Sequence, residues 1–268
     1  MEKRKILLFI PVFNCEKQIL RVLNQITPEV GALIDFVIVV NNLSTDKTEE
    51  SVLDYFKGTD FPCNFALLRN HDNYSLGGSH KVAFNYAIKN GFDYIIVLHG
   101  DDQGNINDLL PYINNSLIEE YDSLLGSRFS LKSKLVNYSK FRIFGNYCLN
   151  IFISFLVFHK ISDLGSGLNL YKTNYLKNKF YLTFPNNLTF NVYMLLYGLY
   201  AKSKFRFFPL TWKEEDQVSN AKLFSQTKEI IELAFRYLIN PGKLFSFQDN
   251  AYSRMKYESD VVYSRTKE

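Results

Sequence analysis

Residues 94–105 read "YIIVLHGDDQGN", an apolar run followed directly by a histidine, a glycine and two adjacent aspartates. The run Tyr94–Leu98 is typical of a buried strand. Two neighbouring carboxylates repel each other, and burying them costs free energy unless a cation or hydrogen bonds compensate. The stretch is therefore either a polar loop after a strand or a site where oxygen ligands hold a divalent metal at the end of that strand.

Similar apolar runs precede this stretch at Ile6–Val12, Phe36–Val40 and Phe65–Leu68. Helical patterns alternate with them at Glu16–Gln25, Thr48–Phe56, Ser79–Lys89 and Asn107–Asn115. Short apolar strands alternating with helices predict an α/β fold with a mostly parallel central sheet flanked by helices. The polar loops "PVFNCE", "NNLSTDKT", "NHDNYSLGGS" and "HGDDQGN" should then meet at the carboxyl edge of the sheet, where such folds bind ligands.

The second half of the chain has a less regular pattern. Strands are expected at Ser123–Gly126 and Phe205–Leu210, and helices at Phe141–Phe158, Leu188–Lys202 and Ser225–Leu238. Without a linker or a repeat, residues 1–240 are expected to form one domain with two halves, about 1–120 and 121–240. Residues 241–268 are expected to be a polar, partly disordered tail.

Composition limits the class of protein. The 268 residues are 47% hydrophobic with a net charge of +4, which indicates a globular chain and argues against a nucleic-acid partner. Cys15, Cys63 and Cys148 form neither a disulfide framework nor a zinc spacing, which favours a reducing, cytoplasmic compartment. The start "MEKRKILLFIPVFN" is interpreted as a strand rather than a signal peptide, and no apolar run reaches the ~18 residues of a membrane span.

Six segments together resemble one family. "IPVFN", "VIVVNNLSTDKT" and "VLHGDDQGNINDLLPYI" resemble the first-strand, second-strand and Asp-x-Asp segments of family 2 glycosyltransferases. "LLGSRF", "SDLGSGLNLYK" and "PLTWKEEDQVSNAKL" follow in the order seen in the dolichyl- or polyprenyl-phosphate sugar synthase branch. The resemblance covers roughly residues 5–235. It implies a GT-A-like fold, with a nucleotide-binding first half and an acceptor-binding second half. The implied activity is inverting transfer of a sugar from a nucleotide-diphospho-sugar to a polyprenyl phosphate.

The resemblance also implies which residues face the nucleotide-sugar donor. They are Pro11, Asn14, Asn41, Asn42, Ser44, Asp46, Gly77, Gly78 and Asp101. Family members usually carry carboxylates where Asn41 and Asn42 stand, and amides keep hydrogen bonding but bring no charge. Ser44, Thr45 or Asp46 would in addition cap the following helix. The two glycines form either a flexible turn or a close backbone approach to the nucleotide, while Lys81 is expected on a solvated helix face.

In the same alignment Asp101 is the expected metal ligand, helped by Gln103 or Asp102, and His99 replaces the first aspartate of the motif. The metal would be Mn²⁺ or Mg²⁺, and an imidazole ligand favours manganese. The resemblance makes Asp101, Arg128 and Asp163 the catalytic candidates, with Arg128 facing a phosphate or else forming a surface salt bridge. Asp163 would act as a general base only for a hydroxyl acceptor, because a phosphate is already an anion.

Several alternatives stay open. If the acceptor is a sugar hydroxyl, as in polysaccharide or lipid-linked oligosaccharide assembly, Glu215 and Asp216 join Asp163 as candidate bases, against a solvated acidic face. The lost carboxylates also allow a non-catalytic nucleotide-sugar binding protein. The helix at Phe141–Phe158 is apolar almost all round, so it is either buried, for example in a homodimer contact, or meets lipid. Lysines upstream of it would suit peripheral contact with the inner face of an anionic membrane.

Overall fold

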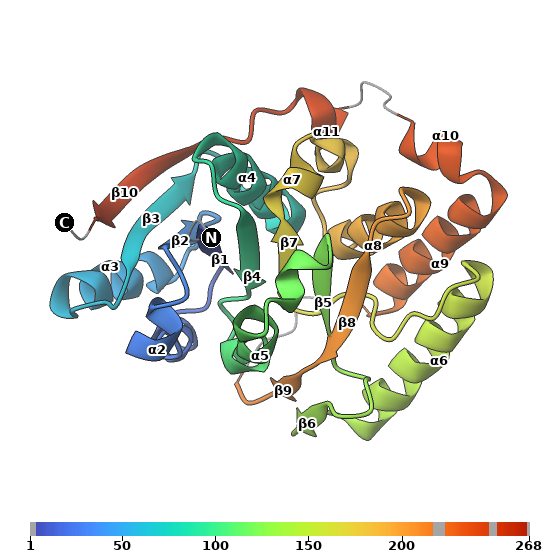
Figure 1. The fold of residues 1–268 in the computed structure, drawn as a ribbon, viewed down its shortest axis with the longest axis horizontal. Helices are drawn as coiled ribbons and strands as arrows, with labels where there is room; N and C mark the ends of the chain where they lie inside the picture. The colour runs from blue at the N-terminus through green and yellow to red at the C-terminus, as the bar shows by residue number, and fades with distance from the viewer. Residues whose placement is uncertain (1–3, 217–222, 247–250, 267–268) are drawn as a thin grey trace.

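The computed structural model describes residues 4–216, 223–246 and 251–266. An eight-stranded sheet crosses the molecule in the order β10-β3-β2-β1-β4-β7-β5-β8 (Figure 1). Its strands are β1 (Ile6–Val12), β2 (Phe36–Asn41), β3 (Asn64–Asn70), β4 (Tyr94–Leu98), β5 (Ser123–Ser127), β7 (Leu168–Lys172), β8 (Phe205–Pro209) and β10 (Ser259–Arg265). A separate parallel pair joins β6 (Lys134–Val136) to β9 (Thr211–Lys213).

Most neighbouring strands run parallel, which confirms the α/β prediction. β1 pairs in parallel with both β2 and β4, β2 with β3, and β5 with β8. Two strands run the other way. β7 lies antiparallel between β4 and β5, and β10 lies antiparallel along the outer edge of β3.

The sheet has a core on each face because its central strands are apolar at every position. In β1, Leu8 and Ile10 belong to one core, whereas Leu7 and Phe9 belong to the other. Complete burial on both faces explains why these strands read as continuous apolar runs rather than alternating ones.

The first core takes side chains from α1 (Ile19–Asn24), α2 (Pro28–Gly31), α3 (Thr48–Gly58), the 3₁₀ turn Ile106–Asp108, α5 (Leu110–Asn114) and the 3₁₀ turn Leu117–Glu119. The second takes them from α4 (Ser75–Lys89), α6 (Lys140–Leu156), α7 (Thr173–Leu176), the 3₁₀ turn Phe180–Thr183, α8 (Phe190–Tyr200), α9 (Leu223–Ile239) and α10 (Pro241–Phe245). The short α11 (Ala251–Arg254) precedes β10.

Two expectations from the sequence are corrected. The chain after Asn240 is not simply a polar, partly disordered tail, because Ser259–Arg265 forms β10 and Tyr257 is buried beside Tyr74. The predicted helix Asn107–Asn115 is split into a 3₁₀ turn and α5, with Pro111 near the start of the second piece. The expected division into halves at about residue 120 stays a prediction. Among the described residues, no helix combines the length and apolar composition needed to cross a membrane.

Candidate functional site at the carboxyl edge of the sheet

The loops after β1 and β2 are joined by hydrogen bonds. Asn14, whose φ of 52° is left-handed, accepts at Oδ1 from the Thr45 backbone N–H at 2.8 Å, and its own N–H donates to Ser44 Oγ at 3.1 Å. The Cys15 N–H donates to Thr48 Oγ1 at 2.8 Å. The two loops therefore form one rigid edge, although their residues are about thirty positions apart.

Asp46 forms hydrogen bonds both to the loop after β1 and to the start of the following helix. Its carboxylate accepts from the Thr48 N–H at 3.0 Å, at the start of α3, and from the Glu16 N–H at 3.1 Å. The capping interpretation of this stretch thus corresponds to an observed hydrogen bond.

Asn41 and Asn42, at the end of β2, are both engaged. Asn41 accepts from the Ser44 N–H at 2.9 Å and donates to Glu49 at 2.6 Å. The Asn42 amide is buried; it donates to Asn73 and accepts from Asn70 and from the Tyr74 N–H, all within 2.9 Å. An amide can both donate and accept, so it connects these partners in a way that a carboxylate could not.

An open pocket of about 380 Å³ lies beside Asn41. Its lining residues are Asn41, Leu43, Ser44, Asp46, Lys47, Glu49, Glu50 and Arg69. Glu49 forms a salt bridge with Arg69 at the rim, and this contact lowers the pKa of Glu49. Three of the predicted donor residues, Asn41, Ser44 and Asp46, thus share one cavity.

The loop after β4 packs against the end of β1. The Gly100 N–H donates to the Pro11 carbonyl at 3.1 Å, and a Cβ at Gly100 would lie 2.9 Å from that oxygen. The His99 N–H donates to the Gly167 carbonyl at 2.9 Å. These bonds bring Pro11, the aspartate pair and the loop at 163–167 to one place.

The two adjacent aspartates have different surroundings. Asp102 is buried and accepts from Arg21 at 2.6 Å, Gln25 at 3.1 Å and Lys213 at 2.9 Å, so it holds α1 and β9 together. Asp101 accepts from the Gln103 N–H at 3.3 Å, and burial raises its pKa to about 6. Arg21, Gln25 and Lys213 offset the charge of Asp102, whereas burial is the largest influence on the pKa of Asp101.

This environment can be tested against the expected metal. Within the described parts of the chain, no three His, Cys, Asp or Glu side chains come together to hold a metal. A carboxylate whose charge is disfavoured by burial suits a cation, and Mg²⁺ or Mn²⁺ at such sites keeps water and substrate phosphates as further ligands. His99 Nε2 is buried without a hydrogen-bond partner, and burial, with the charge of Arg128, lowers the pKa of His99 to about 4. The ring is therefore neutral, as a metal ligand must be.

Arg128 and Asp163 form a bidentate pair beside this loop. Arg128 Nε and Nη2 donate to the two carboxylate oxygens at 2.8 and 2.7 Å, and the Gly165 N–H donates to the same carboxylate at 3.1 Å. The guanidinium also lies 5.2 Å from the centre of the Trp212 ring. Asp163 therefore fixes the orientation of Arg128.

The acidic run after Trp212 is paired with cations too. Glu214 contacts Arg142 at 2.6 Å, Glu215 lies 3.8 Å from Lys213, and Asp216 contacts Arg21 at 2.7 Å, which lowers the pKa of Asp216. The rest of the segment quoted from the sequence, residues 217–222, lies outside the described residues.

Two expectations about α4 are changed by the contacts. Gly77 and Gly78 lie in its first turn, and a Cβ on either would meet protein atoms within 3 Å, of Phe190 and Pro185 for Gly77 and of Tyr74 for Gly78. The close approach is therefore between α4 and the protein itself. Lys81 does not lie on a solvated face but is completely buried.

Sequence reasoning missed Arg21, Gln25 and Lys213, which surround Asp102, and Arg69 at the donor pocket. Arg21, Gln25 and Arg69 lie on or next to α1 and β3, outside the quoted segments. Lys213 lies within one of them, but no local pattern marks it as a partner of Asp102. The one signal in the sequence was a pair of adjacent aspartates after an apolar strand, which requires a cation or hydrogen bonds nearby if the pair is buried.

Comparisons with known proteins identify the family and the fold. The sequence model of the family described as Glycosyl transferase family 2 matches residues 8–180, well over half of the chain. No curated protein matches the chain significantly in sequence.

Similar solved structures include glucosyl-3-phosphoglycerate synthase from Mycobacterium tuberculosis in complex with Mn²⁺, UDP and phosphoglyceric acid. It is 14% identical with a TM-score of 0.62 over 92% of this chain and 80% of that one. The structure of the same protein with Mn²⁺, UDP-glucose and glycerol 3-phosphate is 15% identical, with a TM-score of 0.59 over 88% of this chain and 80% of that one. S. aureus TarS, residues 1–349, is 18% identical with a TM-score of 0.53, over 90% and 72% of the two chains. At these identities the likeness concerns the fold.

Proposed function

Because the chain belongs to glycosyl transferase family 2, we propose that it transfers a sugar from a nucleotide-diphospho-sugar to a polyprenyl phosphate, with inversion at the anomeric carbon. The GT-A-like fold expected from the sequence is the fold of the similar structures. In the proposed reaction, an acceptor phosphate oxygen attacks the anomeric carbon as the bond to the diphosphate oxygen breaks.

The donor would occupy the carboxyl edge of β1, β2 and β4. The pocket beside Asn41 has room and polar lining for part of a nucleotide, and the loop with Asp101 lies next to it through Pro11 and Asn14. The similar synthase was solved with UDP and UDP-glucose, which supports a nucleotide-sugar here without fixing its base.

Asp101 would hold a divalent cation, Mn²⁺ or Mg²⁺, with Gln103 and the neutral His99 as further candidate ligands. A bound cation would stabilise the negative charge of the departing nucleoside diphosphate. The raised pKa of Asp101, which is half-buried, supports this role. Mn²⁺ is present in the similar synthase complexes.

One observation favours a phosphate over a hydroxyl acceptor: every candidate general base faces a cation. Asp163 contacts Arg128, Glu215 lies near Lys213, and Asp216 contacts Arg21. A carboxylate held this way is a poor base, and a phosphate acceptor needs none. Arg128, oriented by Asp163 and Trp212, would instead contact the acceptor phosphate or the diphosphate. The polyprenyl chain itself is inferred from the branch-like segments of the second half.

Thermal unfolding with a panel of nucleoside diphosphates, with and without Mn²⁺, tests the donor site. A nucleotide at a hundred times its dissociation constant should stabilise the protein by about 2.7 kcal/mol. Stabilisation that requires the metal, disappears in Asp101→Ala and survives in the exposed control Asp54→Ala is the expected result. Binding without turnover of any nucleotide-sugar would favour a non-catalytic binding protein.

Asp163→Asn separates the two acceptor classes. We expect a weaker apparent affinity for polyprenyl phosphate, by about tenfold, with an unchanged pH profile, because Arg128 loses its ionic partner. If Asp163 is instead a general base for a sugar hydroxyl, the variant should lose the acidic limb of the profile and most of its kcat. Transfer to a glycan but not to polyprenyl phosphate would contradict the proposal.

A further inference from the structure

α6 carries apolar side chains on its solvent-facing side as well as on its buried side. Asn150, Ile153 and Leu156 face the protein. The exposed side and the residue two positions after the helix carry Phe141, Phe144, Ile151, Phe155 and Phe158, which are between 68% and 83% exposed. Within the helix, the spacing of three, seven and four residues places Phe141, Phe144, Ile151 and Phe155 along one stripe. An exposed apolar stripe of this length marks an interaction surface rather than ordinary surface variation.

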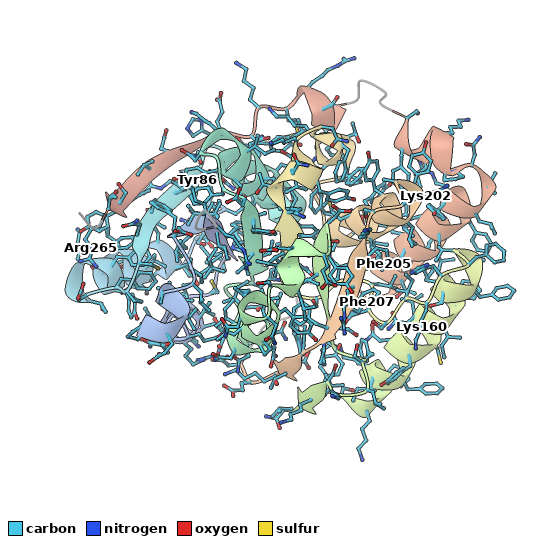
Figure 2. All side chains as sticks on the ribbon, in the orientation of Figure 1. Tyr86, Lys160, Lys202, Phe205, Phe207 and Arg265 are labelled. Carbon is cyan, nitrogen blue, oxygen red and sulfur yellow. The ribbon has the colours of Figure 1, made fainter. Side chains whose placement is uncertain are left out.

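The apolar surface extends beyond α6. Leu131, in the loop between β5 and β6, is fully exposed, and it lines a pocket of about 290 Å³ together with Phe129, Lys160 and Phe207. Figure 2 labels Lys160 and Phe207 on this side of the molecule. On the neighbouring α9, Ile239 is 80% exposed.

This face lies along one margin of the molecule. α6 and α9 run beside each other there, and the rings of Phe152 and Phe235 join them with centres 6.3 Å apart. In Figure 1 the two helices form the right-hand edge, opposite α3 and β10. Among the described residues, those that line the donor pocket do not line the pocket beside Leu131.

The segment that carries the stripe has charges of one sign. Between Asp122 and Asp163 the sequence contains no acidic residue. Lysines frame the stripe: Lys132 and Lys134 lie before α6, Lys140 is its first residue and Lys160 lies after it, and all four are exposed. Exposed apolar side chains framed by lysines match the interface of a bilayer that contains anionic lipids.

We infer that this face, Leu131 with the outer side of α6, docks the protein on an anionic lipid bilayer. A second copy is the competing occupant, since a two-fold contact would also cover the stripe. Such a contact would bring the lysines of both copies together, and residues 123–162 supply no acids to pair them. Anionic head groups supply that missing charge.

Docking in this way has a consequence for the active site. Phe129 and Ser162, which line the pocket beside Leu131, directly follow Arg128 and directly precede Asp163 in the sequence. A docked molecule would therefore hold Arg128 close to the bilayer surface, where the phosphate of a lipid acceptor lies. This consequence rests on the proposed function, whereas the docking surface does not.

Vesicle flotation tests the inference. The full chain should float with phosphatidylcholine vesicles that contain phosphatidylglycerol, and much less with phosphatidylcholine alone or at high salt. The variant Leu131→Ser/Phe141→Ser/Phe155→Ser should bind at least tenfold more weakly. Lys132→Gln/Lys134→Gln should also lose about tenfold or more, since each lysine near an anionic surface contributes roughly fivefold.

Matched controls come from the opposite side of the molecule. Val261→Ser removes an exposed apolar side chain of β10, and Lys89→Gln an exposed lysine of α4; both should float like the wild type. Flotation of the triple variant at the wild-type level, or of the wild type with neither vesicle, would overturn the inference. A wild-type dimer that becomes monomeric in the triple variant, without vesicle binding, would assign the face to a second copy. Unchanged nucleotide stabilisation in the variants shows that the donor site is intact, so the two proposals can fail separately.

Discussion

Asp101 and Asp102 are adjacent in sequence, yet their carboxylates lie in different electrostatic surroundings. Asp102 is surrounded by Arg21, Lys213 and Gln25, so its burial is compensated within the chain. Burial raises the pKa of Asp101 to about 6. A site at which burial disfavours the charge of a carboxylate loses stability and keeps a place for a cation. The contribution of Asp101 to the free energy of unfolding can therefore be measured as a function of pH.

We expect Asp101→Asn to stabilise the protein near neutral pH by about 1–3 kcal/mol. The pKa of Asp101 is higher in the folded state than its ordinary value of 3.8. The folded state therefore holds the proton more tightly, and the free energy of unfolding falls as pH rises from about 4 to about 6. The gain in the variant should vanish below pH 4, where the carboxyl is protonated in both states.

Urea unfolding of both proteins across this pH range measures the difference, with Asp54→Asn as an exposed control. The same Asp101→Asn variant should lose the metal-dependent stabilisation by nucleotide. A variant no more stable than the wild type above pH 6 would mean that the charge of Asp101 is already compensated without a metal.

At the scale of elements, the sequence predicted the positions of strands better than their surroundings. β1, β2 and β4 were predictable because a strand buried on both faces is apolar throughout. β10 was not, because an edge strand buries little: most of Ser259–Arg265 is exposed or half-buried, and its polar residues resemble a tail. The motifs marked the carboxyl edge correctly, but the partners of Asp102 and Asp163 come from distant segments and follow from the tertiary fold alone.

Lys81 in α4 is the clearest case of a residue whose surroundings could not be predicted from the sequence. A lysine near the start of a helix is usually solvated, but this side chain is fully buried, and burial lowers its pKa to about 7. Its ammonium donates to the Leu182 carbonyl at 3.2 Å, to Asn186 Oδ1 at 2.8 Å and to the Tyr257 hydroxyl at 3.0 Å. It also donates to the Phe184 carbonyl. One side chain thus ties α4 to the loop before α8 and to the last segment of the chain.

We expect Lys81→Met to lower the free energy of unfolding by about 2–4 kcal/mol near neutral pH, since buried carbonyls lose their donor. For the wild type, the lowered pKa means that the unfolded state binds the proton more tightly between pH 7 and 10. Its stability should therefore rise with pH over that range, and the rise should be absent in the variant. Chemical unfolding at several pH values measures both effects, with the exposed Lys89→Met as a control. An equally stable variant would show that the buried ammonium costs as much as its hydrogen bonds contribute.

At the scale of the whole molecule, the two ends of the sheet are protected differently. β8 ends one side, near the lysine-framed apolar face. On the other side β10 covers the edge of β3, which would otherwise present unpaired backbone groups and invite pairing with another chain. The last segment of the chain thus contributes to the domain, even though its composition alone indicates a tail.

A truncation after Met255 tests how far the domain depends on this segment. It removes β10 and Tyr257, whose ring packs on Tyr74 and whose hydroxyl accepts from Lys81. Lost backbone pairing and lost burial should together lower the free energy of unfolding by at least about 3 kcal/mol, and the bare β3 edge should promote aggregation. A truncation after Arg265 keeps β10 and is the control, expected to unfold and sediment like the full chain. If the truncation after Met255 is as stable as the full chain and stays monomeric, the α/β domain is complete without β10. The exposed edge of β3 then does not cause aggregation.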